Sequence, residues 1–94
     1  MTRKRSRLEI YLDILRTVKS GVNRPTNIMY KCNLAWKPFK RILSALVDNG
    51  LIMKIEKGNR KIYELTDKGQ FMLKYFETAE AILVDLREPN EVFS

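Results

Sequence analysis

The chain has 94 residues, with 18 Lys and Arg against 11 Asp and Glu, no His and a single Cys. A chain of this length forms one domain with a modest core, which further helix packing or dimerisation stabilises. A lone Cys32 excludes an internal disulfide, and without His the usual metal clusters are missing. No run approaches the roughly 20 apolar residues that span a bilayer. We therefore expect a soluble, cytoplasmic protein without cofactor or metal.

Positive charge is concentrated in the first two thirds of the chain. Residues 1–65 carry 15 Lys or Arg against 5 Asp or Glu, a balance of +10, whereas residues 66–94 carry 3 against 6, a balance of −3, which together give the net charge of +7. A polyanion would therefore meet the N-terminal part. The alternatives are a basic composition that only keeps the protein soluble or reflects a ribosomal role.

A short basic arm, residues 1–5, precedes the first expected helix. Such an arm is either a solvated terminus or a segment that contacts phosphates or a minor groove. For Arg7 and Arg16, within the helix, the sequence leaves two similar alternatives, which are exposure to solvent and contact with backbone phosphates.

The first helix begins with a capping-box pattern, Ser6 followed by Glu9, and is expected to end at Gly21. Its spacing predicts an apolar face of Leu8, Tyr11, Leu12, Ile14, Leu15 and Val18.

A second, short helix is expected from Thr26, as its N-cap, to about Cys32. Ile28 and Met29 should point inward, while Arg24 and Lys31 flank the helix. Asn33 and Leu34 then form a tight turn.

The third helix should begin near Ala35 or Trp36 and end at Asn49 and Gly50; Pro38 is tolerated in its first turn. One face is apolar, with Phe39, Ile42, Leu43, Leu46 and Val47. The other carries a ridge of polar residues at i, i+3, i+4 and i+7, namely Lys37, Lys40, Arg41 and Ser44. Two helices joined by so short a turn make a helix-turn-helix, and this ridge has the spacing needed to enter a DNA major groove.

Two strands are expected next, over residues 51–56 and 61–65, joined by the polar, glycine-containing tip 57–60. A hairpin placed here forms a β-wing. Its cations Lys57, Arg60 and Lys61 would then face a neighbouring minor groove or phosphate ridge, although hairpin tips are polar in most proteins.

The last helix should run from Thr66 and Asp67 to about Arg87, before Pro89. At about 31 Å it is longer than a domain this small can cover. Its apolar stripe therefore needs a partner, which we expect to be the same helix of a second copy, packed antiparallel; the alternative is that it folds back on its own domain. The stripe comprises Met72, Tyr75, Phe76, Ala79, Ile82, Leu83 and Leu86.

Five segments make the chain resemble the archaeal winged helix-turn-helix family, in particular its small chromatin-associated members from Sulfolobus: SRLEIY at 6–11, PTNIMY at 25–30, NLAWK at 33–37, NGL at 49–51 and YELTDKG at 63–69. The resemblance implies a homodimer joined by a C-terminal coiled coil, nucleoid-associated, that offers two wings and two third helices to duplex DNA. One departure is Ala35, where such proteins often carry a Ser that caps the third helix.

These observations predict an α+β, mostly α, fold: a winged helix-turn-helix of three helices and a two-stranded wing over residues 1–65, a long dimerisation helix over 66–88 and a tail over 89–94. We expect a double-stranded DNA-binding protein, either a transcriptional regulator or a chromatin-associated architectural protein. Arg41 is the candidate for bidentate contact with guanine, whereas the lysines neutralise phosphates. Trp36 either seals the core or contacts a sugar. The full set of expected DNA contacts is Arg24, Thr26, Lys31, Trp36, Lys37, Lys40, Arg41, Ser44, Lys57, Arg60 and Lys61.

Three other functions compete with DNA binding. An enzyme is disfavoured because the lone Cys32 has no evident base beside it and no glycine-rich loop precedes a helix. A protein–protein interaction module without nucleic-acid contact is the stronger alternative, but it should keep apolar anchors on the third helix. Binding to RNA would favour exposed, interleaved aromatic residues, which the sequence lacks.

Overall fold

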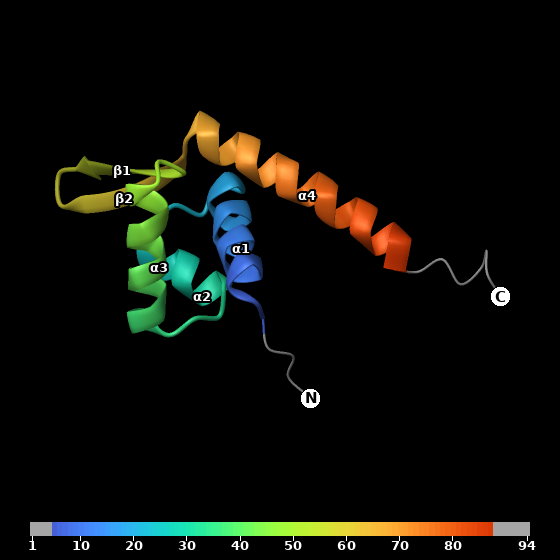
Figure 1. The fold of residues 1–94 in the computed structure, drawn as a ribbon. Helices are drawn as coiled ribbons and strands as arrows, with labels where there is room; N and C mark the ends of the chain where they lie inside the picture. Colours follow the sequence, from blue (N-terminus) through green and yellow to red (C-terminus); the bar gives the residue numbers. More distant parts are fainter. Residues whose placement is uncertain (1–4, 88–94) are drawn as a thin grey trace.

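The computed structural model describes residues 5–87, and describes side chains as far as Leu83. Three predicted features lie outside these limits: residues 1–4 of the basic arm, the tail 89–94 and the side chain of Leu86. In chain order, the elements are α1 (Arg7–Lys19), α2 (Pro25–Lys31), α3 (Trp36–Asp48), β1 (Ile52–Lys57), β2 (Arg60–Leu65) and α4 (Asp67–Arg87). The predicted architecture of three helices, a two-stranded wing and a long last helix is confirmed (Figure 1).

Local signals in the sequence set the start and end of α1. The Ser6 hydroxyl accepts from the backbone N–H of Glu9 at 3.1 Å, and the Glu9 carboxylate accepts from the N–H of Ser6 at 2.8 Å, so the capping box is formed. Gly21 follows the helix with a φ of +105°. One predicted core residue is wrong, because Leu8 lies in the first turn, beyond the packed region, and is 45% exposed.

The short helix α2 begins two residues earlier than predicted. Pro25 occupies the first turn, and the capping position is Arg24, which makes no side-chain capping bond; the predicted cap by Thr26 is therefore wrong. The fixed φ of proline favours this start without a capping side chain. The turn to α3 passes through Asn33, whose φ is +56°. Asparagine is among the residues that adopt this left-handed conformation most readily.

The third helix matches its predicted limits. It follows Ala35, which provides no side-chain cap, and it ends before Asn49 and Gly50, where Gly50 has a φ of +75°. The carbonyl of Ala45 accepts twice from Asn49, from its backbone N–H at 3.0 Å and from its side-chain amide at 2.7 Å.

The wing is a regular antiparallel hairpin with a two-residue turn. Ile52 pairs with Leu65 at its base, and Lys57 pairs with Arg60 at its tip. Gly58, at the first turn position, has a φ of +61°, as primed hairpin turns require. Both strands reach one residue closer to the tip than predicted. The N–H of Tyr63 donates to the carbonyl of Asn23 at 2.8 Å, which ties the loop before α2 to the wing.

A single core lies where α1, α2, α3 and the base of the wing meet (Figure 1). Its largest fully buried side chains are Ile14, Ile28, Phe39, Ile52 and Leu73. They come from five different elements, so the core fixes α3 and the wing relative to each other.

The helix α4 starts against this core and then leaves it. The Thr66 hydroxyl donates to the carbonyl of Gly50 at 2.6 Å and accepts from the N–H of Gly69 at 2.9 Å, which fixes the first turn. Leu73 is buried, but the far half of α4 projects away from the domain, and the molecule measures 60 × 32 × 20 Å (Figure 1). In the described residues, α4 and the other helices are all too short or too polar to cross a membrane.

Candidate nucleic-acid interface

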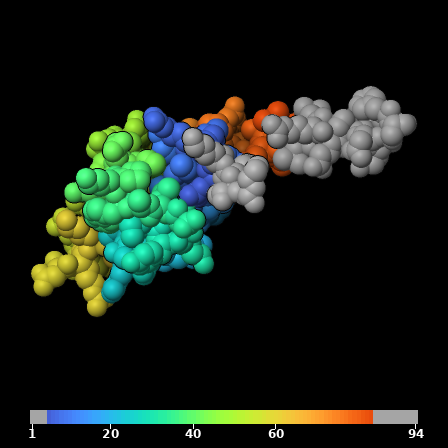
Figure 2. All heavy atoms as spheres, turned by 90° about the horizontal axis from the view of Figure 1, so that it is seen from below, coloured from blue at the N-terminus to red at the C-terminus, as the bar shows by residue number. Residues whose placement is uncertain are grey.

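The predicted polar ridge of α3, which we call the α3 ridge, lies at the surface. Phe39, Leu43 and Leu46 are buried on the opposite side of α3, which turns Lys37, Lys40, Arg41 and Ser44 outward, and all four are exposed. Viewed from below, α3 (green) and the wing (yellow) lie at the surface at the end of the molecule opposite α4 (Figure 2). No element of the chain covers the ridge among the residues that the structure describes.

The wing forms one wall of a cleft beside the ridge. The cleft encloses about 380 Å³ between α3, the wing and the start of α2. Lys40 and Ser44 line it from α3, and Lys54 and Lys61 line it from the two strands. Because Lys54 pairs with Tyr63 and Glu56 with Lys61, this alternate face of the hairpin turns toward α3. Lys54 was missed by sequence reasoning, although the strand alternation with Lys61 could have placed it here.

A second groove, of about 410 Å³, lies on the other side of the ridge, between α1 and α3. Its two cations are Arg7 and Arg41, and its remaining walls are mostly apolar, with Ile10, Tyr11, Pro38, Ile42 and Ala45. Lys40 and Arg41 are neighbours in sequence, but Lys40 lines the wing-side cleft and Arg41 lines the groove beside α1. The ridge is therefore flanked by a cationic groove on each side.

These cations are largely free of acidic partners. Over the side chains that the structure describes, the ion pairs of this surface are limited to a 3.8 Å contact between Lys54 and Glu56. The carboxylate of Asp48 lies at the last turn of α3, where it lines the wing-side cleft and reduces the positive charge. The N-terminal two thirds of α3 therefore offer the stronger attraction to an anion.

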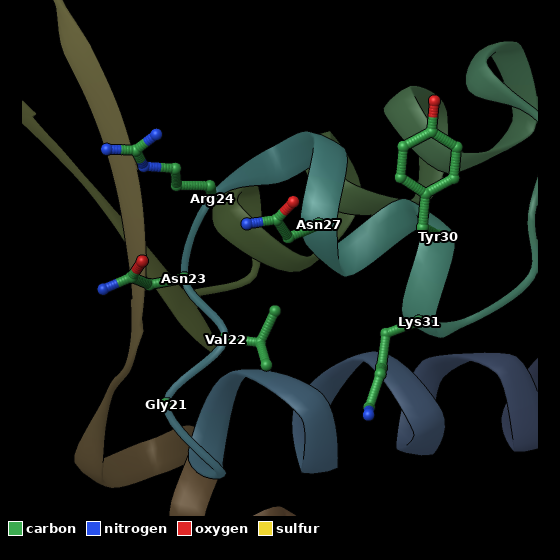
Figure 3. Close-up of a pocket in the computed structure, with 7 residues that line it drawn as sticks. All are labelled: Gly21, Val22, Asn23, Arg24, Asn27, Tyr30 and Lys31. Carbon is green, nitrogen blue, oxygen red and sulfur yellow. The ribbon is translucent and has the colours of Figure 1, made fainter.

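The outer face of α2 carries a third group of polar residues. A shallow depression of about 560 Å³ is lined by Gly21, Val22, Asn23, Arg24, Asn27, Tyr30 and Lys31. In Figure 3 the Arg24 side chain points toward the wing strand, whereas Lys31 points toward α1. Arg24 and Lys31, the two cations predicted to flank α2, therefore point in different directions. Thr26 is exposed in the first turn of α2.

Trp36 occupies an intermediate position at the start of α3. Its side chain is 49% exposed, and its ring centroid lies 6.0 Å from that of Phe39 at an interplanar angle of 41°. One side of the indole thus covers the core, and the other lines the wing-side cleft. The half-buried ring agrees with a role at the edge of the core, while contact with a sugar stays a prediction.

At the wing tip, Lys57 and Arg60 are exposed on either side of the Gly58–Asn59 turn. They lie on the face of the hairpin opposite Lys54 and Lys61, because side chains alternate along a strand. The wing therefore carries cations on both faces.

One face of α4, from its second turn onward, is largely apolar and has no partner in the described chain. Tyr75 is 60% exposed and Ile82 is 56% exposed, and with Phe71 and Ala79 they line a shallow groove of about 440 Å³. Leu83 is also exposed, and Met72 is half-buried. Phe76 instead packs against the core of its own domain, with its ring edge-on to Tyr75. Phe71, which precedes Met72 of the stripe, is 70% exposed.

The only cysteine is a core residue. The Cys32 side chain is buried, its Sγ lies 3.5 Å from the Thr17 hydroxyl, and burial raises the pKa of its thiol. A buried thiol with a raised pKa is a poor nucleophile. No cluster of three potential metal ligands occurs within the described residues.

Comparison with known families agrees with this geometry. The family model described as winged helix-turn-helix matches residues 4–83. The chain belongs to this family. Its fold is also that of Sso10a-2, a DNA-binding protein from Sulfolobus solfataricus, with a TM-score of 0.77 and 27% identity, covering 95% of this chain and 93% of that chain.

Two further structures show the same winged fold at low identity. A point mutant of ZitR from Lactococcus lactis has a TM-score of 0.69 and 19% identity, covering all of this chain and 69% of that one. The transcriptional regulator PA4135 has a TM-score of 0.65 and 13% identity, covering 87% of this chain and 65% of that one.

The curated relatives come from Methanocaldococcus jannaschii. The uncharacterized protein MJ0290 is 38% identical over 74 residues, and the uncharacterized protein MJ0287 is 39% identical over 67 residues. These alignments cover 79% and 71% of this chain. The matched parts span 33% of the first relative and 65% of the second.

Proposed function

We propose that this winged helix-turn-helix protein binds double-stranded DNA, with α3 in the major groove and the wing against the adjacent backbone. The observation that carries the proposal is the exposed α3 ridge with a cationic groove on each side. A helix in the major groove, which is about 12 Å wide, has a phosphate strand on either side of it. The two grooves are placed to receive these two strands. The similar structure of Sso10a-2, named as a DNA-binding protein, supports the same assignment.

The position of each side chain suggests its role. Lys40, with Lys54 and Lys61, would neutralise the strand on the wing side, and Arg41, with Arg7, the strand on the α1 side. Arg41 thus fits a phosphate contact better than the guanine contact expected from sequence. Lys37 lines neither groove and Ser44 lies at the edge of the wing-side cleft, and both would face the base edges. Because most of these contacts are to phosphates, sequence preference should be weak and salt dependence strong.

The remaining predicted contacts are assigned to the edges of the interface. Arg24 and Thr26, at the start of α2, would brace the backbone next to the wing. Lys57 and Arg60 would contact the flanking groove, and the exposed side of Trp36 would rest on a sugar. Lys31 points away from the wing in Figure 3 and is the least supported member of the predicted set.

We further propose that the protein binds DNA as a homodimer joined through α4 and acts as a nucleoid-associated regulator or architectural protein. The support is the exposed apolar face of α4, centred on Tyr75, Ala79 and Ile82. An exposed apolar face of this length on a projecting helix is typical of a protein–protein contact. An isologous pairing with a second copy would bury it.

The DNA-binding proposal is tested by mobility shifts of random-sequence duplexes across a series of salt concentrations. Replacing Lys40 and Arg41 together by Ala should weaken binding several-fold at low salt. It should also flatten the slope of log affinity against log salt by about 2, since each phosphate contact contributes about 0.9. Lys19→Ala, an exposed cation at the end of α1, is the matched control. A double variant that binds like the wild type would refute the placement of α3.

A further inference from the structure

The helix α4 is attached to the domain at two places. The first attachment is apolar and lies in its first three turns. There Gly69 packs closely against the backbone of Leu51, and the side chains of Leu73 and Phe76 pack in the core. The second lies further along the helix and is ionic. It is made by a single residue of α1, Arg16, which contacts two carboxylates of α4.

Arg16 donates hydrogen bonds to α4 from separate nitrogens of its guanidinium. Its Nε donates to Glu77 Oε2 at 2.7 Å, and its Nη2 donates to Glu80 Oε1 at 3.0 Å. Because Glu77 and Glu80 are three residues apart on one face of α4, the planar guanidinium contacts both at once, in a geometry that depends on the distance and the rotation of the helix. The hydrogen bond that Arg16 donates to Glu77 raises the pKa of Arg16.

The contact continues through α1 to the helix-turn-helix. Arg16 Nη1 also donates to Asp13 at 3.3 Å, and the second oxygen of Asp13 accepts from Arg5 at 2.8 Å. Arg5 Nη2 in turn donates at 2.7 Å to the carbonyl of Cys32, the residue that follows α2 at its C-terminal end. We call this connected set the ionic strut; its members are Arg5, Asp13, Arg16, Glu77 and Glu80.

The strut lies where a change of angle has most effect. Beyond Glu80, the described side chains of Ala81, Ile82 and Leu83 are all exposed. The 21 residues of α4 span about 31 Å, so a tilt of about 10° at its base would move its far end by roughly 5 Å. Members of the strut are between 30% and 48% exposed, so each pair adds little to folding stability. Their larger effect is on direction.

We propose that Arg16 is a positioning residue, which fixes the angle between α4 and the DNA-binding face through Glu77 and Glu80. This proposal rests on the function proposed above, because that angle would set the separation of the two DNA-binding faces in a dimer. A protein that contacts DNA mostly through phosphates could select its target by this separation rather than by base sequence.

The test measures the angle directly, with spin labels in the full-length chain. Labels are placed at two exposed positions, Asn59→Cys on the wing and Ala81→Cys on α4, with Cys32 replaced by Ala. Labelled chains are diluted tenfold with unlabelled chains, so that pulsed electron paramagnetic resonance reports the distance within one chain. The compared variants are Arg16→Met, the pair Glu77→Gln and Glu80→Gln, and the control Lys19→Met, which removes a cation of α1 that is outside the strut.

We expect a narrow distance distribution in the parent and in Lys19→Met. It should be at least twice as wide, or clearly displaced, in Arg16→Met and in the double Gln variant, with partial recovery in Arg16→Lys. Raising the salt to 1 M, where the Debye length is about 3 Å, should broaden the parent distribution toward that of Arg16→Met. A distribution in both variants that matches the parent would overturn the proposal.

A second measurement separates failure of the strut from failure of the proposed dimer. With the label at Asn59→Cys alone and no dilution, a dimer gives a wing-to-wing distance, which Arg16→Met should broaden. If sedimentation shows that the parent is monomeric, the dimer is refuted, while the distance within one chain still decides the role of Arg16. If the dimer forms and its wing-to-wing distance is equally narrow in Arg16→Met, the strut does not set the separation of the faces.

Discussion

Lys40 and Arg41 show how adjacent residues of a helix take different roles. Successive residues on a helix are about 100° apart, so Lys40 turns toward the wing and Arg41 toward α1. Helical spacing alone groups them on one ridge. Only the neighbours of α3 distinguish them, and those neighbours come from β1, β2 and α1.

Gly69 is required by close packing rather than by backbone conformation. A Cβ at this position would collide with the carbonyl oxygen of Leu51 and press on the side chain of Leu65. We expect Gly69→Ala to lower the free energy of unfolding by about 1–3 kcal/mol, the usual cost of overpacking. Thermal or urea denaturation followed by circular dichroism would measure the change. The exposed neighbour Gln70→Ala should alter stability by less than about 0.5 kcal/mol, and equal stability of the two variants would contradict this role.

Cys32 gives a prediction about pH. Burial raises the pKa of its thiol above the ordinary value of 9.0, so the folded state holds the proton more tightly than the unfolded state. Its contribution to stability is therefore fully present below the unfolded-state pKa and is lost as the pH rises through the folded-state pKa. We expect alkylation by iodoacetamide at about pH 8, just below the ordinary thiol pKa, to be slow in the native protein and fast in denaturant. Rapid alkylation under native conditions would show that the thiol is accessible.

At the scale of elements, the apolar face of α4 is the feature that its own domain does not explain. Replacing Ile82 by Asp places a charge on this face and should convert the proposed dimer to a monomer. Ala81→Asp, one residue away and outside the face, should leave the proposed dimer intact. Sedimentation equilibrium at tens of micromolar would measure both. A wild-type protein that is monomeric at this concentration would remove the basis of the prediction.

The elements differ in how much of them the sequence determines. The ends of α1 and α3 were predictable because their signals, such as the Ser6–Glu9 capping box and Gly50, act over at most four residues. The start of α2 was misjudged because Pro25 begins a helix without a capping side chain. Phe76 was assigned to the α4 stripe by periodicity, but α4 packs on α1 through part of the same surface, and helical spacing cannot distinguish two partners.

At the scale of the whole molecule, the sequence indicated which residues form the candidate site but not how they are grouped. The exposure of the α3 ridge was predictable from amphipathic spacing. The position of Arg41 and Arg7 in the same groove was not predictable, because it depends on the angle at which α1 crosses α3. The contacts of Arg16 were also hidden, since Glu77 and Glu80 are 61 and 64 residues away in sequence.

The most direct test of the account is to map the surface that contacts DNA. In a titration of the ¹⁵N-labelled protein with a random-sequence duplex, amide shifts should concentrate in α3, in the wing from Lys54 to Lys61 and around Arg7. The outer face of α2 around Tyr30 should change little. Shifts confined to that face of α2, or an unchanged spectrum at low salt, would contradict the assignment of the α3 ridge as the DNA-binding surface.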